Sequence, residues 1–337
     1  MKSTDFATHL TEFLKIYLPG HRGLSANTIV SYRDTFRFML VYAEESYGIP
    51  AEKLTLAEMT AEFIYGYLNW LETERNNSIM TKRQRLAAIH VFIQFLKLRK
   101  PEYLLEFQKI LDIKIKKKDS GNIGYLSPDE VQKLLSEPNL TQRYGRRDMV
   151  LLSLMYDSGA RVQEICDLRV SDVRLAKPST VTLTGKGGKS RIVPLMGETA
   201  EAVRKYIVEN RLSTPEKQSY PLFTNHADTK LTRAGVAYIL RKYCDAARDK
   251  SAVFPKSVSP HQLRHSKAMH MLKAGTDLIY IRDFLGHSQL ATTEIYAKAD
   301  TGMKRQAIEN ASPHLTPDLP DWTKDTSLMA MLTDLCK

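Results

Sequence analysis

The sequence predicts a mainly α-helical protein with a small antiparallel β-sheet in its second half. Apolar residues recur at helical spacing through most of residues 6–98, with almost no strand-like alternation between them. The pattern changes to alternation over residues 180–195, which is typical of a β-hairpin. A basic run that passes into a Gly, Ser and Asn segment separates the two regions. With 337 residues, the chain is long enough for two domains, each with its own core.

These features predict the domain organisation. Residues 1–112 form a helical domain, residues 113–124 a basic interdomain linker, residues 125–311 an α+β domain and residues 312–337 a C-terminal tail. The tail ends in an amphipathic stretch whose apolar stripe consists of Leu328, Met331, Leu332 and Leu335. This stretch could dock on a neighbouring subunit or pack against its own domain, and the sequence leaves both alternatives open.

Four helices are expected in the first domain, over residues 6–17, 28–47, 61–74 and 81–98. Ser25 stands at the N-cap position of the second helix, and Ser78 or Thr81 can cap the fourth. Polar and basic residues near these helix starts are candidate phosphate contacts, although a solvated helix face is the commoner role of such residues. They are Thr28, Tyr32, Arg33, Thr81, Lys82, Arg83 and Arg85.

The second domain opens with a strong helix start. Ser127 is the expected N-cap, Pro128 occupies the first helical position and Glu130 completes a capping box. The next helix ends near Gly159, which can adopt the left-handed conformation that closes a helix. The elements expected in this domain beyond residue 136 are helices over 145–156, 161–168, 199–210, 231–247, 260–274, 278–285 and 292–296, and the hairpin over 180–195.

The charge balance is basic. The chain carries 49 Lys and Arg against 38 Asp and Glu, a formal net charge of +11. Residues 1–118 hold 18 basic and 13 acidic residues, so both halves are basic, as in a clamp on a DNA duplex. Many soluble proteins are mildly basic without binding nucleic acid, so charge alone leaves the partner open. Three separated cysteines, no leader segment and no 18-residue apolar run predict a cytoplasmic protein with no membrane association.

Six polar residues of the second domain stand out as a group. Ser259 and Pro260 open a helix, so that His261 and Arg264 project from its first turn, where free N–H groups attract an anion such as phosphate. Each residue taken singly has an ordinary structural explanation, such as an ion pair, a turn lysine or a buried aromatic. The group consists of Arg161, Lys186, His261, Arg264, His287 and Tyr296.

Three other motifs can be rejected. Gly188-Lys-Ser190 resembles the end of a phosphate-binding P-loop, but Leu183 stands where that loop needs its first glycine. His261 and His265 have the spacing of zinc ligands, but Gln262 replaces the glutamate of a metalloprotease. No Gly-x-Ser-x-Gly nucleophile elbow occurs.

Four ordered motifs together closely resemble the tyrosine recombinase (phage integrase) family. They are Gly159-Ala-Arg161, Gly185-Lys-Gly-Gly-Lys-Ser-Arg-Ile-Val-Pro-Leu195, His261-Gln-Leu-Arg-His265, and Leu285-Gly-His287 with Tyr296. Residues 25–98 are similar to the helical core-binding domain of that family. The resemblance implies an all-helical, DNA-binding core-binding domain followed by an α+β catalytic domain, with no additional arm-binding domain before them.

The resemblance also implies a chemistry and a role for each residue. Tyr296 attacks the scissile phosphate to form a 3′-phosphotyrosine, with no metal, ATP or other cofactor. Arg161 and Arg264 hold the non-bridging oxygens, and Glu164 supports the site. Lys186 is the general acid for the leaving 5′-oxygen, and Lys189 is the alternative. His261 assists the nucleophile and His287 bonds the phosphate.

The implied partner is double-stranded DNA with specific recombination sites, bound by a homo-tetramer that joins two duplexes. The remaining expected DNA contacts are Lys116, Lys117, Lys118, Lys189 and Arg191. A C-terminal segment exchanged between subunits, and a second recombinase subunit or helper factor, are further implied partners.

Four functions remain compatible with the sequence and with the resemblance. The sequence favours integration, excision or transposition of a mobile element, slightly over Xer-like resolution of chromosome or plasmid dimers. A catalytically silent DNA-bridging factor is less favoured because the catalytic set is intact. A type IB topoisomerase is less favoured because residues 25–98 resemble a recombinase domain.

Overall fold

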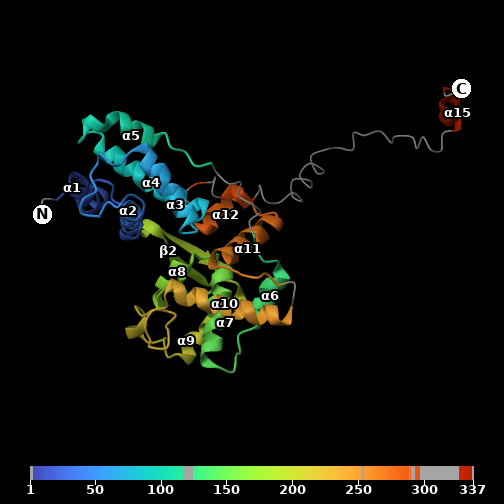
Figure 1. Ribbon diagram of the computed structural model, residues 1–337. Coiled ribbons are helices and arrows are strands. Elements are labelled where there is room, and N and C mark those ends of the chain that lie inside the picture. The colour runs from blue at the N-terminus through green and yellow to red at the C-terminus, as the bar shows by residue number, and fades with distance from the viewer. Residues whose placement is uncertain are drawn as a thin grey trace. The chain divides into compact units, whose positions relative to one another are not determined.

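The computed structural model describes residues 3–116, 124–251, 254–287, 289, 293–296 and 326–335. Contacts within the chain divide it into two compact units, Met1–Ser120 and Gly121–Lys337 (Figure 1). The basic segment predicted between the domains falls at this division, but Lys117 and Lys118 lie outside the described residues. Residues 297–325, which include most of the predicted tail, also lie outside them.

The first unit, which we call the helical unit, is built from helices alone in its described part. A core of buried aromatic rings holds it together: Phe13 lies 5.0 Å from Phe92 and 6.1 Å from Phe36, measured between ring centroids. Aromatic pairs at such distances add to the stability gained from burial. The elements are α1 (Asp5–Glu12), η1 (Phe13–His21), α2 (Ala26–Tyr47), α3 (Ala61–Thr73), α4 (Ile79–Leu96), η2 (Pro101–Tyr103) and α5 (Leu104–Leu111).

The four helices expected in this unit are confirmed, with two differences. The first helix changes at Phe13 into a π-helix, which accommodates Pro19. Helix α5 was not predicted, because its eight residues are too few to show a clear helical pattern. Ser78 caps α4 as expected, since its Oγ accepts from the N–H of Thr81.

The second unit contains a three-stranded sheet and a larger set of helices. We call it the catalytic unit, after the domain that the sequence resemblance implies for these residues. Helix α7 packs against α9 and α11, and α10 packs against α8 and α11. Its elements are α6 (Pro128–Ser136), α7 (Arg143–Ser158), α8 (Val162–Asp167), η3 (Val170–Asp172), β1 (Val173–Arg174), β2 (Thr180–Thr184), η4 (Lys186–Gly188), β3 (Ser190–Pro194), α9 (Gly197–Glu209), η5 (Pro215–Lys217), α10 (Arg233–Lys250), α11 (Pro260–Lys273), α12 (Leu278–Leu285), a helical turn at residues 293–296 and α15 (Thr326–Asp334).

The sheet is antiparallel in the order β1-β2-β3. Val181 pairs with Val193 across β2 and β3, and both side chains are buried. This is the predicted hairpin, and the fold class of a mainly helical chain with a small antiparallel sheet is confirmed. Strand β1 was not predicted because two residues are too few to show alternation.

Two helix ends position the site. The capping box of Ser127 and Glu130 starts α6 as expected. Helix α7 ends at Gly159, whose φ of 57° is left-handed, and a Cβ there would lie only 2.9 Å from Phe284 Cε1. Glycine thus lets α12 approach the end of α7, which brings Arg161 close to the residues that follow α12.

The two described cysteines form no disulfide. Cys166 and Cys244 are buried and unpaired, whereas Cys336 lies outside the described residues. Within the described ranges, no helix is both long and apolar enough to cross a bilayer.

Candidate active site

One carboxylate joins two of the predicted cationic residues. Glu164 is 3% exposed and accepts hydrogen bonds of 2.8–2.9 Å from both guanidinium groups of Arg161 and Arg191. It also accepts 2.8 Å from the Arg161 backbone N–H, which starts α8. Burial alone would raise the pKa of Glu164, but these bonds lower it to about 2. Glu164 is therefore ionised at neutral pH and fixes both guanidiniums.

The guanidinium of Arg191 is bonded within the protein. We expected it to contact DNA, but its Nη atoms bind Glu164 and its Nε donates 2.8 Å to the carbonyl of Phe284. Its side chain is 13% exposed. The arginine therefore links β3, α8 and the end of α12, and supports Arg161 from within the protein.

Arg264 is the most deeply placed cation of the site. It is 1% exposed, and its Nη atoms donate 2.7 Å each to the carbonyls of Gly159 and Leu285. Its buried Nε has no hydrogen-bond partner among the described residues. Burial, followed by Arg161 and Arg191, lowers the pKa of Arg264, but a guanidinium still remains charged at neutral pH. The Nε–H of this buried cation therefore lacks an acceptor in the described part of the free protein.

Gly286 closes the site on one side. It ends α12 with a φ of 65°, and its carbonyl accepts 3.2 Å from Arg161 Nη2. A Cβ at Gly286 would lie 3.0 Å from Arg191 Cδ. The Leu-Gly-His motif therefore serves to bring a backbone carbonyl against the arginines.

Charge in this cluster is unbalanced. Arg161, Arg191 and Arg264 interact with one another and, among the described residues, share the single carboxylate Glu164. Three guanidiniums and one carboxylate leave an excess of two positive charges in a largely buried place. Such an excess attracts an anion of the size and charge of a phosphodiester.

Two of the predicted histidines border the cluster. His287 directly follows α12, and its Nδ1 lies 2.9 Å from Thr293 Oγ1. Burial, followed by Arg264 and Arg161, lowers the pKa of His287 to about 4, so the ring is neutral at pH 7 and can donate one hydrogen bond. His261, in the first turn of α11, is exposed.

Tyr296 lies inside the protein. It is 1% exposed and packs with the apolar group of Met269, Leu272, Ile281 and Leu285. Its Oη lies 2.8 Å from Nδ1 of His265, a residue the sequence-based prediction did not select. Burial raises the pKa of Tyr296, and Arg264 and Arg161 oppose this rise. Tyr296, the predicted nucleophile, is therefore a neutral phenol close to the arginine cluster.

The hairpin loop carries the two candidate general acids. Lys186 opens the loop between β2 and β3, and Gly187 and Gly188 follow with φ values of 78° and 74°. The side chain of Lys186 lies outside what the structure describes, and Lys189 is exposed. The choice between the two lysines thus stays a prediction.

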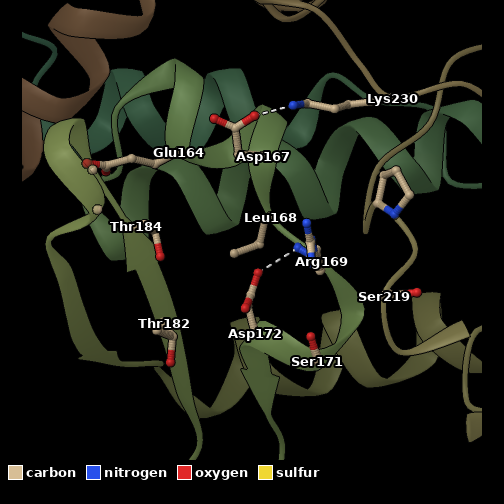
Figure 2. A pocket seen from close by; sticks show the side chains of 13 residues that line it. Glu164, Asp167, Leu168, Arg169, Ser171, Asp172, Thr182, Thr184, Ser219 and Lys230 are labelled. Atoms are coloured by element: carbon tan, nitrogen blue, oxygen red, sulfur yellow. Dashed lines mark hydrogen bonds and ion pairs between the residues drawn. The ribbon is translucent and has the colours of Figure 1, made fainter.

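A polar pocket of about 640 Å³ lies behind Glu164, beside β2 (Figure 2). Its lining carries the carboxylates of Glu164, Asp167 and Asp172 against the cations of Arg169 and Lys230. Asp167 pairs with Lys230, and Asp172 accepts a hydrogen bond from the backbone N–H of Arg169. Thr182 and Thr184 line the wall formed by β2. The pocket lacks the excess positive charge of the arginine cluster, so the cluster is the better anion site.

In the helical unit, the predicted DNA contacts fall into two groups. Lys82 is 7% exposed and its ammonium group is paired with Glu72. Tyr32 stacks on Phe13, and exposed Arg33 binds Asp34 at 2.9 Å. Those at or near the surface are Thr28, Thr81, Arg83, Arg85 and, after α5, Lys116.

Three arginines of the helical unit surround one ring. The guanidinium carbons of Arg37, Arg75 and Arg85 lie 4.9, 5.4 and 4.7 Å from the centroid of Phe38. Among the described residues, none of the three forms an ion pair with a carboxylate. Arg37 and Arg75 were not predicted, because they are far apart in sequence and only the packing of the helices brings them to Phe38.

Comparison with known proteins agrees with these observations. Residues 124–303 match the phage integrase family, and residues 10–100 match the N-terminal SAM-like domain of phage integrases. The chain belongs to the phage integrase (tyrosine recombinase) family. This confirms the resemblance inferred from the four sequence motifs.

The relatives include a protein named as an integrase/recombinase and recombinases named as Xer proteins. The "Putative integrase/recombinase y4rC" of Sinorhizobium fredii is 32% identical over 99% of both chains. Tyrosine recombinase XerD of Oceanobacillus iheyensis is 34% identical over 89% of this chain and 96% of its own length. The XerH recombinase bound to a palindromic difH substrate has a TM-score of 0.67 at 22% identity, covering 86% of this chain and 81% of that chain, and shows the shared fold.

Proposed function

We propose that this tyrosine recombinase is a site-specific enzyme that cleaves and rejoins DNA strands through a 3′-phosphotyrosine on Tyr296. The observation that carries the proposal is the cluster of Arg161, Arg191 and Arg264 around one carboxylate, next to a buried tyrosine. The excess positive charge matches a scissile phosphodiester, and the phenol supplies the nucleophile.

Arg161 and Arg264 bind the two non-bridging oxygens in this mechanism. The partly exposed guanidinium of Arg161 is the group most accessible to the substrate, and the buried Nε–H of Arg264 is a donor that still lacks an acceptor among the described residues. As the phosphate becomes five-coordinate, its charge increases between two cations that Glu164 and three backbone carbonyls already hold in place. Such preorganised charge replaces the metal ions used by other phosphoryl-transfer enzymes.

The remaining roles follow the predicted division. Lys186 protonates the leaving 5′-oxygen, His287 donates a hydrogen bond to the phosphate, and His261 assists the nucleophile. A substrate with a 5′-bridging phosphorothiolate tests the first role, because its sulfur leaves without a proton. Cleavage of this substrate by Lys186→Ala at the wild-type rate supports Lys186, and failure of that rescue assigns the role to Lys189.

DNA binding is assigned to both units. In the helical unit we propose Thr28, Thr81 and Arg83, near the starts of α2 and α4, and the arginines around Phe38 as phosphate contacts. In the catalytic unit Lys189 is the exposed candidate. Lys82 and Arg191 are left out because both are ion-paired within the protein.

We further propose that the enzyme acts as a homo-tetramer on two duplexes and that its C-terminal segment is exchanged between subunits. The short helix α15 supports this idea, with Met331 and Leu335 at its end 58% and 70% exposed. Deleting residues 324–337 should abolish cooperative assembly on DNA, measured by gel shift. Unchanged cooperativity in the deletion variant would argue for packing of the helix within its own subunit.

The biological role proposed is the movement of a mobile element, with Xer-like dimer resolution as the second candidate. Full-length similarity to the Sinorhizobium fredii integrase/recombinase supports the first, and similarity to XerD supports the second. Recombination of an element's ends by this protein alone favours the first role. Dependence on a different recombinase subunit favours the second.

Trapping of a covalent intermediate tests the central proposal. The full-length protein is incubated in EDTA with nicked duplexes from a random library, and SDS-resistant protein–DNA adducts are isolated. We expect an adduct with wild-type protein and none with Tyr296→Phe, and sequencing of the captured DNA would identify the site. Binding without an adduct in both proteins would favour the DNA-bridging alternative, and relaxation of any plasmid would favour a topoisomerase.

A further inference from the structure

Among the described residues, the hydrogen-bonding neighbour of Tyr296 Oη is His265, on α11. Its Nδ1 lies 2.8 Å from Tyr296 Oη, with the ring centroids 5.4 Å apart at 65°. His265 follows Arg264 directly, so the residue that holds the phosphate and the residue that contacts the nucleophile share one helical turn. None of the roles assigned above uses this contact.

The direction of the hydrogen bond follows from the burial of Tyr296. The phenol is neutral and 1% exposed, so its proton needs an acceptor inside the protein. Nδ1 can accept only if the ring carries its own proton on Nε2. Burial, followed by His261 and Arg264, lowers the pKa of His265 to about 4, which keeps the ring neutral at pH 7. The bond therefore runs from Tyr296 Oη–H to His265 Nδ1.

His261 is less suited to this task. It is exposed, and its ring lies edge-on to that of His265 with centroids 4.3 Å apart. Within the described residues, the hydrogen bond of Tyr296 goes to His265 alone. His261 therefore lies on the exposed side of this pair, and the assistance proposed for it reaches Tyr296 through His265.

We propose that His265 is the catalytic base that takes the proton of Tyr296 during cleavage and returns it during rejoining, an inference that rests on the proposed function. As the Oη–P bond forms and the bond from phosphorus to the 5′-oxygen breaks, the phenol proton moves to Nδ1. The general acid protonates the leaving 5′-oxygen, so charge and protons balance. In the reverse step the imidazolium protonates the departing Oη.

The arginine cluster explains how a weakly basic imidazole can perform this step. In the free protein His261 and Arg264 disfavour a positive charge on His265. A bound phosphate neutralises part of the excess positive charge, so it makes protonation of the neighbouring imidazole easier. Proton transfer is thereby coupled to the presence of substrate, and the tyrosine stays unreactive without it.

Single-turnover cleavage of a nicked duplex tests the proposal with two variants. His265→Asn can place an oxygen near the position of Nδ1 and accept the hydrogen bond, but it cannot hold the proton. His265→Ala removes both functions. We expect both variants to cleave about 100-fold more slowly than wild type, a typical loss for a catalytic base. Both should bind DNA as wild type does, and the 5′-phosphorothiolate substrate should not rescue them.

A matched control is present on the same helix. His270 Nδ1 lies 2.7 Å from Tyr156 Oη, a second histidine–tyrosine pair outside the anion cluster. His270→Ala should retain wild-type cleavage if it folds, which melting temperature and DNA affinity check. Wild-type rates in His265→Asn would show that the residue only positions Tyr296, and faster cleavage in His265→Ala would show that it restrains Tyr296. Either result overturns the proposal, whereas the absence of a wild-type adduct would instead overturn the proposed function.

Discussion

Replacing Glu164 by Gln should destabilise the catalytic unit in a pH-dependent way. The carboxylate is 3% exposed and receives four side-chain and backbone hydrogen bonds from Arg161 and Arg191. Glutamine has the same shape, but it removes the negative charge and offers one acceptor oxygen in place of two. The substitution therefore leaves two guanidiniums without their counter-charge while it conserves packing.

The size of the effect follows from the pKa of Glu164. The fold lowers this pKa from 4.5 to about 2, and each unit corresponds to about 1.4 kcal/mol. The charged carboxylate therefore contributes about 3 kcal/mol to the free energy of unfolding at pH 7. This value agrees with the roughly 3–5 kcal/mol that is lost when one partner of a buried ion pair is removed.

The sign of the pH dependence is fixed by the direction of the shift. A carboxylate whose pKa is lowered on folding stabilises the protein fully above its unfolded pKa of 4.5 and loses this effect as the pH falls toward 2. The difference between wild type and Glu164→Gln should thus be constant from pH 7 to about pH 5.5. It should fall to about 2 kcal/mol at pH 3.5.

Urea unfolding of the full-length protein measures this difference. Far-UV circular dichroism follows both units, and in a Trp322→Phe background the fluorescence of Trp70, the other of the two tryptophans, reports on the helical unit as an internal reference. Exposed Glu198, which forms no ion pair among the described residues, provides the control Glu198→Gln, with an expected loss below about 1 kcal/mol. Equal losses in the two variants, or a Glu164→Gln loss that does not change between pH 7 and pH 3.5, would refute the role given to the carboxylate.

Three further predictions concern the site and the DNA contacts. Gly286→Ala should lower the free energy of unfolding, measured in urea, by about 1–2 kcal/mol and should slow cleavage, because φ is 65° and a Cβ would press on Arg191. An unchanged unfolding free energy and an unchanged cleavage rate would contradict this. Arg264→Lys should cleave about 100-fold more slowly in single-turnover assays while DNA affinity is retained, since one ammonium cannot reach both carbonyls and the phosphate; a wild-type rate would contradict it. Arg85→Gln should reduce the slope of log affinity against log salt by about 1 in binding titrations, and an unchanged slope would remove Arg85 from the interface.

Local sequence signals predicted the elements that position the site. The capping box at Ser127, the left-handed Gly159 and the hairpin over residues 180–195 are each determined by neighbouring residues, so their patterns are visible in the sequence. The same is true of the pair formed by Arg161 and Glu164, which are three positions apart. Helix α5 and the two-residue strand β1 were missed because their sequence patterns are too short.

Long-range contacts of the site could not be predicted in this way. Arg191 and Glu164 are 27 positions apart, and His265 and Tyr296 are 31 positions apart. Whether a basic side chain on a strand points to DNA or to a buried carboxylate depends on side-chain packing across elements. The sequence motif placed His265 beside Arg264, but only the folded chain brings Tyr296 to it.

The arginine cluster is held largely by main-chain oxygens. The carbonyls of Gly159, Phe284, Leu285 and Gly286 each accept a hydrogen bond from one of the three guanidiniums. A carbonyl oxygen is the same in every amino acid, so the neighbouring side chains can be exchanged as long as the path of the backbone is kept. The side chains around the cluster can therefore be redesigned for a new DNA sequence without loss of the chemistry, provided that the backbone at the ends of α7 and α12 keeps its conformation.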